Sequence, residues 1–410
     1  MEPAILDSAP TPGISPVLAS LRHVERTTGK SRVRQLREMA DLFHGPGRVS
    51  PREYFYFGLY DDRLFAADRK RAFVGLELQR EILYACTDKR WWALAHDKIT
   101  YYALMQSYGF PIPQVSATLH PFRGLAGAQA LRSREDVQAY LRDPGHYPLF
   151  CKPFDGMRSV GSARIDAYDA ATDEITVYPQ RRVPTSRFVD AVWKYADDGY
   201  LFQQLQHPSP AVEAMCGDRL ASVRLVVLVR KSGPEVFRGV WKIPTGIHVA
   251  DNYWRDGNLL CGIDVATGRV TSAMTGAGPQ RVRVERHPDS GMPLVGMAIP
   301  DWTALQDACL SAAATMPGVT MQGWDAAPCR QGPVLVEVNV GGDFTLPQLG
   351  NDRGLLDDQF KAYLAEHDFS ATLSFDHYLH HVKANVRAPI ASALERVRRR
   401  PASAGQQGMH

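Results

Sequence analysis

The 410-residue sequence lacks several patterns that mark common protein classes. Its six cysteines form no Cys-x-x-Cys pair, which argues against a zinc knuckle or a disulfide framework and favours free buried thiols. No stretch approaches the roughly 20 apolar residues that a membrane helix needs. The first 16 residues contain neither a basic nor an apolar signal segment. We therefore expect a soluble, cytoplasmic protein without a membrane partner.

An excess of charge of one sign is also missing. Lys and Arg total 47 and Asp and Glu total 44, so the formal net charge is only +3. A dedicated nucleic-acid binder usually has a stronger basic excess or a basic stripe, so we expect no nucleic-acid partner. The 45% hydrophobic and 22% charged content is close to that of soluble globular proteins and excludes a wholly disordered chain.

Helical and strand patterns are mixed along the chain. The apolar spacing of residues 17–43 and the helix-start signal Ser50-Pro-Arg-Glu53 predict helices in a first region. Ala221–Arg230 and Val236–Ile243 predict an antiparallel hairpin. Hairpins dominate the second half, without regular β-α-β-α alternation, so the fold class is predicted to be α+β.

Two late β-runs, Met321–Ala327 and Val334–Val340, predict a second hairpin. Because residues two apart share one face of a strand, the valines of the second run are expected to face a core. Leu335, Glu337 and Asn339 are then expected to face the other way.

A turn near residue 331 places Asp325 opposite Glu337, within roughly 5 Å at Cβ. With Asn339, these side chains bring oxygen ligands together on one face. Such a set suits Mg²⁺, which takes further ligands from water or phosphate. A polar, solvent-facing side of a strand is the alternative interpretation when the hairpin is taken alone.

Upstream, a buried-looking strand over residues 148–152 delivers Lys152 at its end. A loop of small residues follows, with backbone N–H groups able to cover phosphates; it contains Gly156, Ser159, Gly161 and Ser162. The lysine precedes the glycines and a strand follows, so the segment is not a Walker P-loop. An ordinary β-turn is the alternative interpretation.

Further basic and amide residues lie on later strands. Residues 200–205 form an apolar run that ends in Gln203, Gln204 and Leu205 and could present backbone groups to an adenine edge. Arg224 lies in the middle of a very apolar strand, where it needs an anionic partner such as phosphate, unless it snorkels to the surface. Lys242 is a second basic candidate of the same kind.

In this order, together with Lys98 at the start of the helix predicted over 97–108, these elements resemble the ATP-grasp superfamily. The sequence is most similar to the sugar-transfer-associated ATP-grasp group and distantly similar to the amino-acid ligases. The resemblance covers about residues 50–365. It implies a two-lobed ATP-grasp fold that clamps ATP between its lobes, with a mostly helical N-terminal region.

The resemblance also implies a role for each motif. The phosphates of ATP would contact Lys98 and Lys152 beneath the loop that carries Gly156, Ser159, Gly161 and Ser162. The nucleotide would further contact Gln203, Gln204, Leu205 and Asn252. The transferring phosphoryl group would be stabilised by Arg224, with Lys242 as a second catalytic cation. One or two Mg²⁺ ions would be held by Asp325, Glu337 and Asn339.

The implied reaction is ATP-dependent ligation of a carboxylate to an amine through an acyl phosphate. The partners would be a small-molecule or peptide carboxylate and an amine acceptor. A small-molecule kinase on the same fold and a non-catalytic nucleotide-binding partner protein are the alternatives.

The expected divisions are a disordered lead (1–16), a helical region (17–95), two lobes (96–200 and 201–366) and a basic C-terminal tail (367–410). The region before Asp97 either completes the acceptor site or mediates homodimerisation, and the sequence leaves both open.

Overall fold

Two seven-stranded sheets organise the chain. The computed structural model describes residues 5–8, 17–156 and 158–369. The first sheet has the strand order β2-β1-β7-β3-β4-β5-β6. Its strands are β1 (Val115–Leu119), β2 (Gln129–Leu131), β3 (Leu149–Pro153), β4 (Ala163–Asp169), β5 (Glu174–Val177), β6 (Arg181–Pro184) and β7 (Tyr200–Gln204). Helices α8 (Arg134–Leu141) and α9 (Thr185–Trp193) share a hydrophobic core with this sheet.

The second sheet has the order β12-β11-β10-β9-β8-β13-β14, and every neighbouring pair in it is antiparallel. Its strands are β8 (Val223–Arg230), β9 (Gly233–Ile243), β10 (Leu259–Asp264), β11 (Arg269–Thr275), β12 (Val282–Arg283), β13 (Met321–Cys329) and β14 (Gly332–Val340). Both hairpins predicted from the sequence, β8–β9 and β13–β14, are confirmed. The α+β prediction is confirmed as well.

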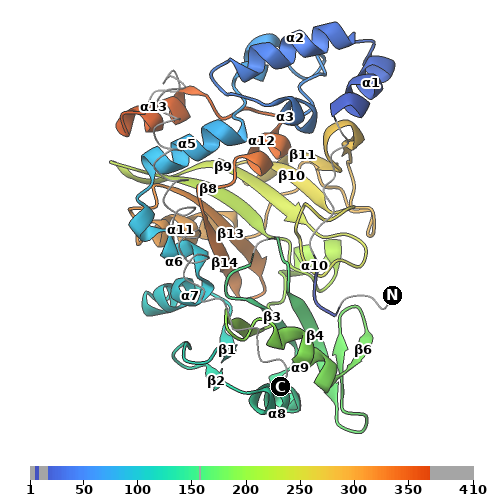
Figure 1. The fold of residues 1–410 in the computed structure, drawn as a ribbon, viewed down its shortest axis with the longest axis vertical. Coiled ribbons are helices and arrows are strands. Elements are labelled where there is room, and N and C mark those ends of the chain that lie inside the picture. The colour runs from blue at the N-terminus through green and yellow to red at the C-terminus, as the bar shows by residue number, and fades with distance from the viewer. Residues whose placement is uncertain (1–4, 9–16, 157, 370–410) are drawn as a thin grey trace, which may run out of the picture.

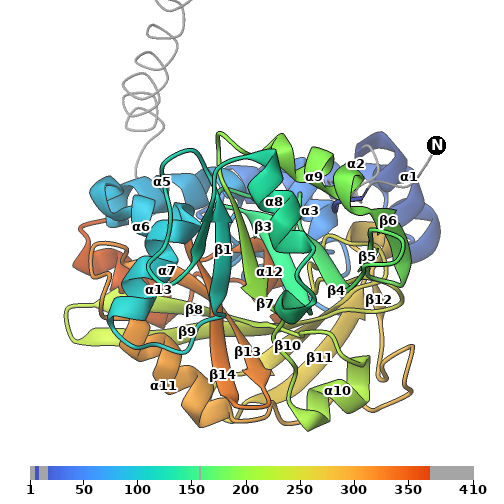
Figure 2. The same ribbon diagram turned by 90° about the horizontal axis from the view of Figure 1, so that it is seen from below.

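Helices surround the second sheet. In Figure 1, α11 (Trp302–Ala313) lies beside β13 and β14, and α12 (Thr345–Asn351) lies over β9 and β10. Helices α10 (Pro210–Cys216) and α13 (Asp358–Glu366) also pack against this sheet. The first sheet lies at the opposite end of the molecule in Figure 1, and Figure 2 shows α8 and α9 on it.

The N-terminal region is helical, as predicted. It contains α1 (Val17–Thr28), α2 (Arg32–Phe43), α3 (Pro51–Tyr56), α4 (Ala67–Arg71), α5 (Leu76–Cys86) and α6 (Ala93–His96). The periodic stretch 17–43 is split into two helices, because Gly29 takes a positive φ of 74° and Ser31 caps the second helix. Ser50 and Glu53 form the predicted capping box.

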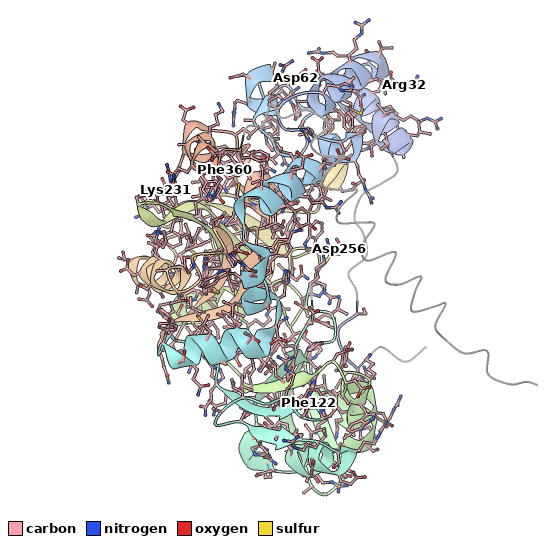
Figure 3. The ribbon with its side chains drawn as sticks, turned by 60° about the vertical axis from the view of Figure 1, so that its left-hand side comes forward. Arg32, Asp62, Phe122, Lys231, Asp256 and Phe360 are labelled. Atoms are coloured by element: carbon pink, nitrogen blue, oxygen red, sulfur yellow. The ribbon has the colours of Figure 1, made fainter. Side chains whose placement is uncertain are left out.

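These first helices pack on the second sheet and not on the first. Tyr54 and Phe55 of α3 share a hydrophobic cluster with Val240 of β9 and Leu260 of β10. Figure 3 shows the resulting elongated molecule, with Arg32 and Asp62 at one end, Phe122 near the other and Asp256 between them. No helix in the described ranges is both long and apolar enough to cross a membrane.

One core cluster joins the two sheets. Tyr101 and Met105 of helix α7 (Lys98–Ser107), which the sequence places in the first lobe, share this cluster with Leu201 of β7 and Trp324 of β13. Within the expected lead, the structure describes residues 5–8. There, Leu6 is buried in the core of the first sheet. Most of the expected basic tail, residues 370–410, lies outside the described residues.

Candidate functional site

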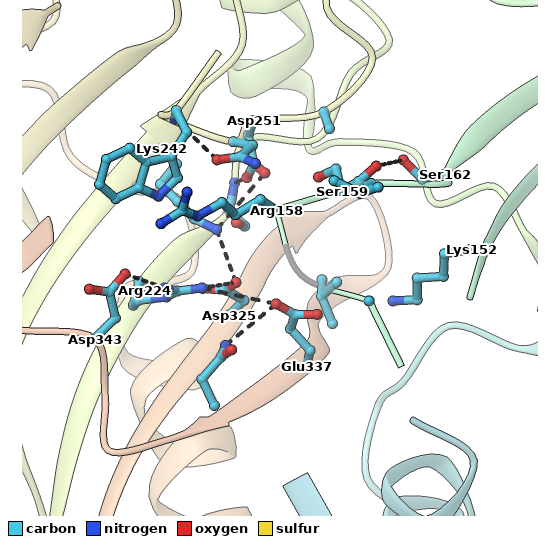
Figure 4. A pocket seen from close by; sticks show the side chains of 18 of the residues that line it. Lys152, Arg158, Ser159, Ser162, Arg224, Lys242, Asp251, Asp325, Glu337 and Asp343 are labelled. Atoms are coloured by element: carbon cyan, nitrogen blue, oxygen red, sulfur yellow. Dashed lines mark hydrogen bonds and ion pairs between the residues drawn. The ribbon is translucent and has the colours of Figure 1, made fainter. Parts of the chain in front are cut away.

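A cavity of about 600 Å³ lies between the two sheets and is lined by residues from both. Most residues predicted for the site line it: Lys98, Lys152, Gly156, Ser159, Ser162, Gln203, Leu205, Arg224, Lys242, Asn252, Asp325, Glu337 and Asn339. Figure 4 shows Lys152 on one side of this space and Arg224, Asp325 and Glu337 on the other. The topology thus brings together residues that are far apart in sequence.

The register of the β13–β14 hairpin sets the position of Glu337. A tight turn pairs Cys329 with Gly332, and this register would by itself bring Val336 opposite Asp325. A bulge next to Asp325 inserts Val336 as an extra residue, so Glu337 becomes the partner of Asp325. The predicted pairing is confirmed, although the sequence interpretation contained no bulge.

The bulge also changes the alternation of side chains on β14. Leu335 is fully buried in the same core cluster as Val338, so its predicted place on the Glu337 face is wrong. Val336 instead lines the cavity beside Glu337 and Asn339. An extra residue shifts the period-2 pattern by one position, which is why strict alternation fails here.

Asp325 lies in a cage of cations. Its two carboxylate oxygens accept hydrogen bonds from Arg224 Nε and Nη2 at 2.8 and 2.7 Å, and Lys242 Nζ donates to Oδ2 at 2.9 Å. Burial raises the pKa of Asp325, but Arg224 and Lys242 outweigh burial and hold this pKa well below its ordinary value. The carboxylate is therefore ionised at neutral pH. Arg224 is a buried, paired arginine and does not snorkel to the surface.

Glu337 and Asn339 are less constrained. The Glu337 side chain is 29% exposed, and its Oε1 lies 3.9 Å from Arg224 Nη2. Asn339 Nδ2 lies 3.4 Å from Glu337 Oε1. In the described residues, no three His, Cys, Asp or Glu side chains are grouped to hold a metal ion. A cation at Glu337 and Asn339 would therefore need ligands from another molecule, such as phosphate oxygens.

Lys98 and Lys152 supply buried positive charge from the other side of the cavity. Lys98 Nζ donates to the backbone oxygen of Gly156 at 2.9 Å. Lys152 Nζ lies over the ring of Tyr102, 5.6 Å from its centroid, and forms no ion pair with any described carboxylate. Burial lowers the pKa of both lysines, while the negative charge of Glu337 opposes that shift.

The loop that follows Lys152 is held by its own backbone and by the chain's first described residues. Ser162 Oγ donates to the backbone oxygen of Ser159 at 2.8 Å. The Gly161 N–H donates to Asp7 O at 2.8 Å, and the Asp7 N–H donates to Ser162 O at 2.9 Å. Gly161 is absent from the cavity lining because its backbone faces this N-terminal segment.

The amide segment at the end of β7 differs from the prediction in its hydrogen bonding. Gln203 is buried and accepts a hydrogen bond from Tyr102 Oη at 3.1 Å. The neighbouring Gln204 is exposed and does not line the cavity, because the strand pleat turns it to the other side. The N–H groups of Gln204 and Leu205 donate to Gln114 O and Pro148 O. They are therefore not free for an adenine edge.

The residues of the cavity wall that the sequence interpretation missed include Tyr56, Arg158 and Trp254. Tyr56 belongs to the buried aromatic run Tyr54–Phe57, and it also lines the cavity. Its ring stacks on Trp254, with 5.7 Å between the ring centroids. The guanidinium of Arg158 lies 4.4 Å from the centroid of the Trp254 ring. No local motif signals this contact, because the three residues come from separate segments.

Two sheets around a cavity, with lysines on one wall and a carboxylate hairpin on the other, define the ATP-grasp class of fold. The chain belongs to the sugar-transfer associated ATP-grasp family, whose model matches residues 79–362. The recognition made from the sequence motifs is thereby confirmed. The match begins inside α5, so α1–α4 and Tyr56 lie outside it.

Solved structures with a similar fold include ligases. The D-alanine-D-alanine ligase from Coxiella burnetii is 15% identical, with a TM-score of 0.37 over 76% of this chain and 68% of that chain. The L-amino acid ligase from Bacillus licheniformis is 12% identical, with a TM-score of 0.32 over 60% of this chain and 40% of that chain. A comparison with curated proteins found no match.

Proposed function

We propose that the protein is an ATP-dependent carboxylate–amine ligase that forms an amide through an acyl phosphate. The observation that carries this proposal is the arrangement of charge across one cavity. Buried Lys98 and Lys152 face Glu337 and Asp325, and the charge of Glu337 acts on the pKa of both lysines. Membership of the ATP-grasp family supports ATP as the phosphoryl donor.

The nucleotide phosphates would bind between the two walls. Lys152 is a buried cation without an ion-pair partner among the described carboxylates, and a charge in that situation favours an incoming anion. Gln203, at the end of β7, would meet the base through its side-chain amide, because the neighbouring N–H groups are engaged.

The residues at the hairpin fit Mg²⁺ bound together with a nucleotide. Glu337 and Asn339 offer a carboxylate and an amide oxygen on the cavity wall, and phosphate oxygens would complete the coordination. Asp325, the third predicted ligand, would share its oxygens with Arg224 and Lys242. The ion supplies charge neutralisation for the phosphates when it is bound.

In the first step, an oxygen of the substrate carboxylate attacks the γ-phosphorus of ATP. The bond from that phosphorus to the β–γ bridging oxygen breaks and ADP leaves. Arg224 and Lys242 would stabilise the negative charge on the transferring group by position and electrostatics. In the second step, an amine attacks the acyl carbon, the C–O bond to phosphate breaks, and the amine loses a proton as the amide forms.

The test is ADP release in mixtures that combine pools of carboxylic acids with pools of amines. We expect release to need both pools and an amide product to accumulate. Release without amine, with a stable phosphoester, would assign a kinase instead, and no release with any pool would overturn an enzymatic function.

We expect Glu337→Gln to lower turnover by at least about 100-fold, the loss typical of removing one group that stabilises transferred charge. Glu366→Gln is the matched control, because Glu366 pairs with Arg230 and does not line the cavity. Equal activity of the two variants would contradict the role of Glu337.

A further inference from the structure

One end of the cavity is built partly from residues outside the matched family segment. Tyr56 ends α3, which precedes residue 79, and it stacks on Trp254 of the loop between β9 and β10. Arg158, from the loop between β3 and β4, lies over the same indole. All three residues line the cavity. The N-terminal region therefore contributes directly to the wall of the site.

The hydroxyl group of Tyr56 lacks a partner. The residue is 4% exposed, and its Oη forms no hydrogen bond with any other described residue. Arg158 and Asp343 both lie close enough to influence the pKa of Tyr56, which burial raises well above its ordinary value. Asp343 itself is bound by Arg224 Nη1 and the Thr345 N–H. The neutral Tyr56 hydroxyl is thus a buried group that can donate a hydrogen bond and has no acceptor among the described residues.

A second unpartnered donor is the side-chain amide of Asn252, which is 8% exposed. The Trp254 N–H donates to its Oδ1 at 3.0 Å. Because a backbone N–H can only donate, this bond fixes which side-chain atom is the oxygen. The other atom, Nδ2, is buried without a partner among the described residues. Its orientation is therefore set, and it can only donate.

Arg158 adds a cationic donor group at the same place. Among the described residues, no carboxylate lies within ion-pair distance of its guanidinium, although many other arginines in the chain have such a partner. Its backbone has a positive φ of 56°, which is uncommon for a residue with a side chain and reflects a specific loop conformation. Stacking on Trp254 holds the guanidinium plane in position.

We propose that Tyr56, Arg158 and Asn252 form a subsite that binds the carboxylate of the acid substrate, a role for Asn252 in place of the nucleotide contact expected from the sequence. Each of the three side chains can donate a hydrogen bond, and a planar carboxylate accepts from an arginine fork and two further donors at once. Trp254 is a positioning residue that orients Arg158 and the Asn252 amide. This inference rests on the proposed ligase function, and it gives the α3 region a part in binding the acid substrate.

Direct binding tests the subsite without turnover. Titration of the full-length protein with benzoate, succinate and inorganic phosphate, followed by calorimetry, measures anion affinity alone. We expect a carboxylate to bind more tightly than phosphate. Tyr56→Phe and Arg158→Gln should each weaken carboxylate binding about tenfold or more, the loss typical of a hydrogen bond to a charged group. The affinity for ATP should change less than twofold.

Tyr60→Phe and Arg182→Gln are the matched controls, because neither residue lines the cavity. Carboxylate binding that is absent, weaker than phosphate binding or unchanged in Tyr56→Phe and Arg158→Gln would overturn the subsite. Because Arg158 is exposed, its substitution leaves the fold intact. Binding that depends on Tyr56 but never supports ADP release would retain the subsite and reject the ligase.

Discussion

Replacing Asp325 by Asn should separate the structural role of this carboxylate from that of Glu337. Asp325→Asn removes the charge that pairs with Arg224 and Lys242, whose side chains are 10% and 7% exposed. Removing one partner from a buried ion pair costs about 3–5 kcal/mol, because the remaining charge stays buried. For a folded protein of this size, that loss in the free energy of unfolding lowers the melting temperature by roughly 10 °C.

Glu337→Gln is the informative comparison. Its side chain is 29% exposed and lies 3.9 Å from the nearest cation, so its contribution to stability should be below about 1 kcal/mol. Thermal unfolding without nucleotide should therefore distinguish two adjacent carboxylates on one hairpin. Both substitutions should abolish turnover, but only Asp325→Asn should also destabilise the fold.

A double substitution checks the cause of the destabilisation. Adding Lys242→Met to Asp325→Asn removes one of the two stranded cations, so part of the lost stability should return. A wild-type melting temperature for Asp325→Asn, or no recovery in the double variant, would refute the account of the cage. Double-substitution cycles of this kind isolate the coupling between contacting groups.

The pH dependence of stability provides a further check on the same cage. The pKa of Asp325 is lowered in the folded protein, so the unfolded state binds its proton more readily. The stabilisation from this carboxylate is therefore fully present above about pH 4 and is lost as the pH falls further. Wild-type protein should lose stability over that range more steeply than Asp325→Asn does.

Three further predictions concern the cavity walls. Lys152→Met should weaken ATP binding about 10-fold to 150-fold in calorimetry, while exposed Lys231→Met should not, and equal affinities would reject the phosphate role. Because burial lowers the pKa of Lys152, wild-type ATP affinity should fall as the pH rises toward the ordinary lysine value, and Lys152→Met should lose that dependence. Deleting Val336 removes the bulge but should keep Glu337 opposite Asp325, because the turn register then brings Glu337 to that position. ADP release should therefore persist with unchanged far-ultraviolet circular dichroism, and loss of release in a folded variant would contradict the register argument.

The sequence predicts most of the local structure that forms the site. The alternating pattern and β-branched residues of β8 and β14, and the capping box at Ser50, are short-range signals that depend on neighbouring residues only. The order of the motifs also identifies the family before any coordinates are considered. Strands β10 and β11 lack such signals, and they form because β9 provides an edge on which to pair.

Features that depend on contacts between distant segments could not be predicted in the same way. The bulge at Val336 leaves no mark in a run of alternating valines, yet it decides which residue faces Asp325. The aromatic run at Tyr54–Phe57 indicates burial. It does not indicate that Tyr56 lines a cavity next to Trp254, which lies about 200 residues further along the chain. An aromatic side chain that packs in a core and one that lines a cavity look the same in the sequence.

The partners of the buried cations show the same limit and bear on the reaction. An arginine in an apolar strand must have an anionic partner, and phosphate was the predicted partner of Arg224. In the structure that partner is Asp325, which also holds Lys242. The cations of the second sheet are thus already neutralised before a nucleotide binds, whereas Lys152 is not. Nucleotide affinity should therefore depend mainly on the lysines of the opposite wall, and the Arg224–Asp325 pair should act on the transferring group from a fixed position.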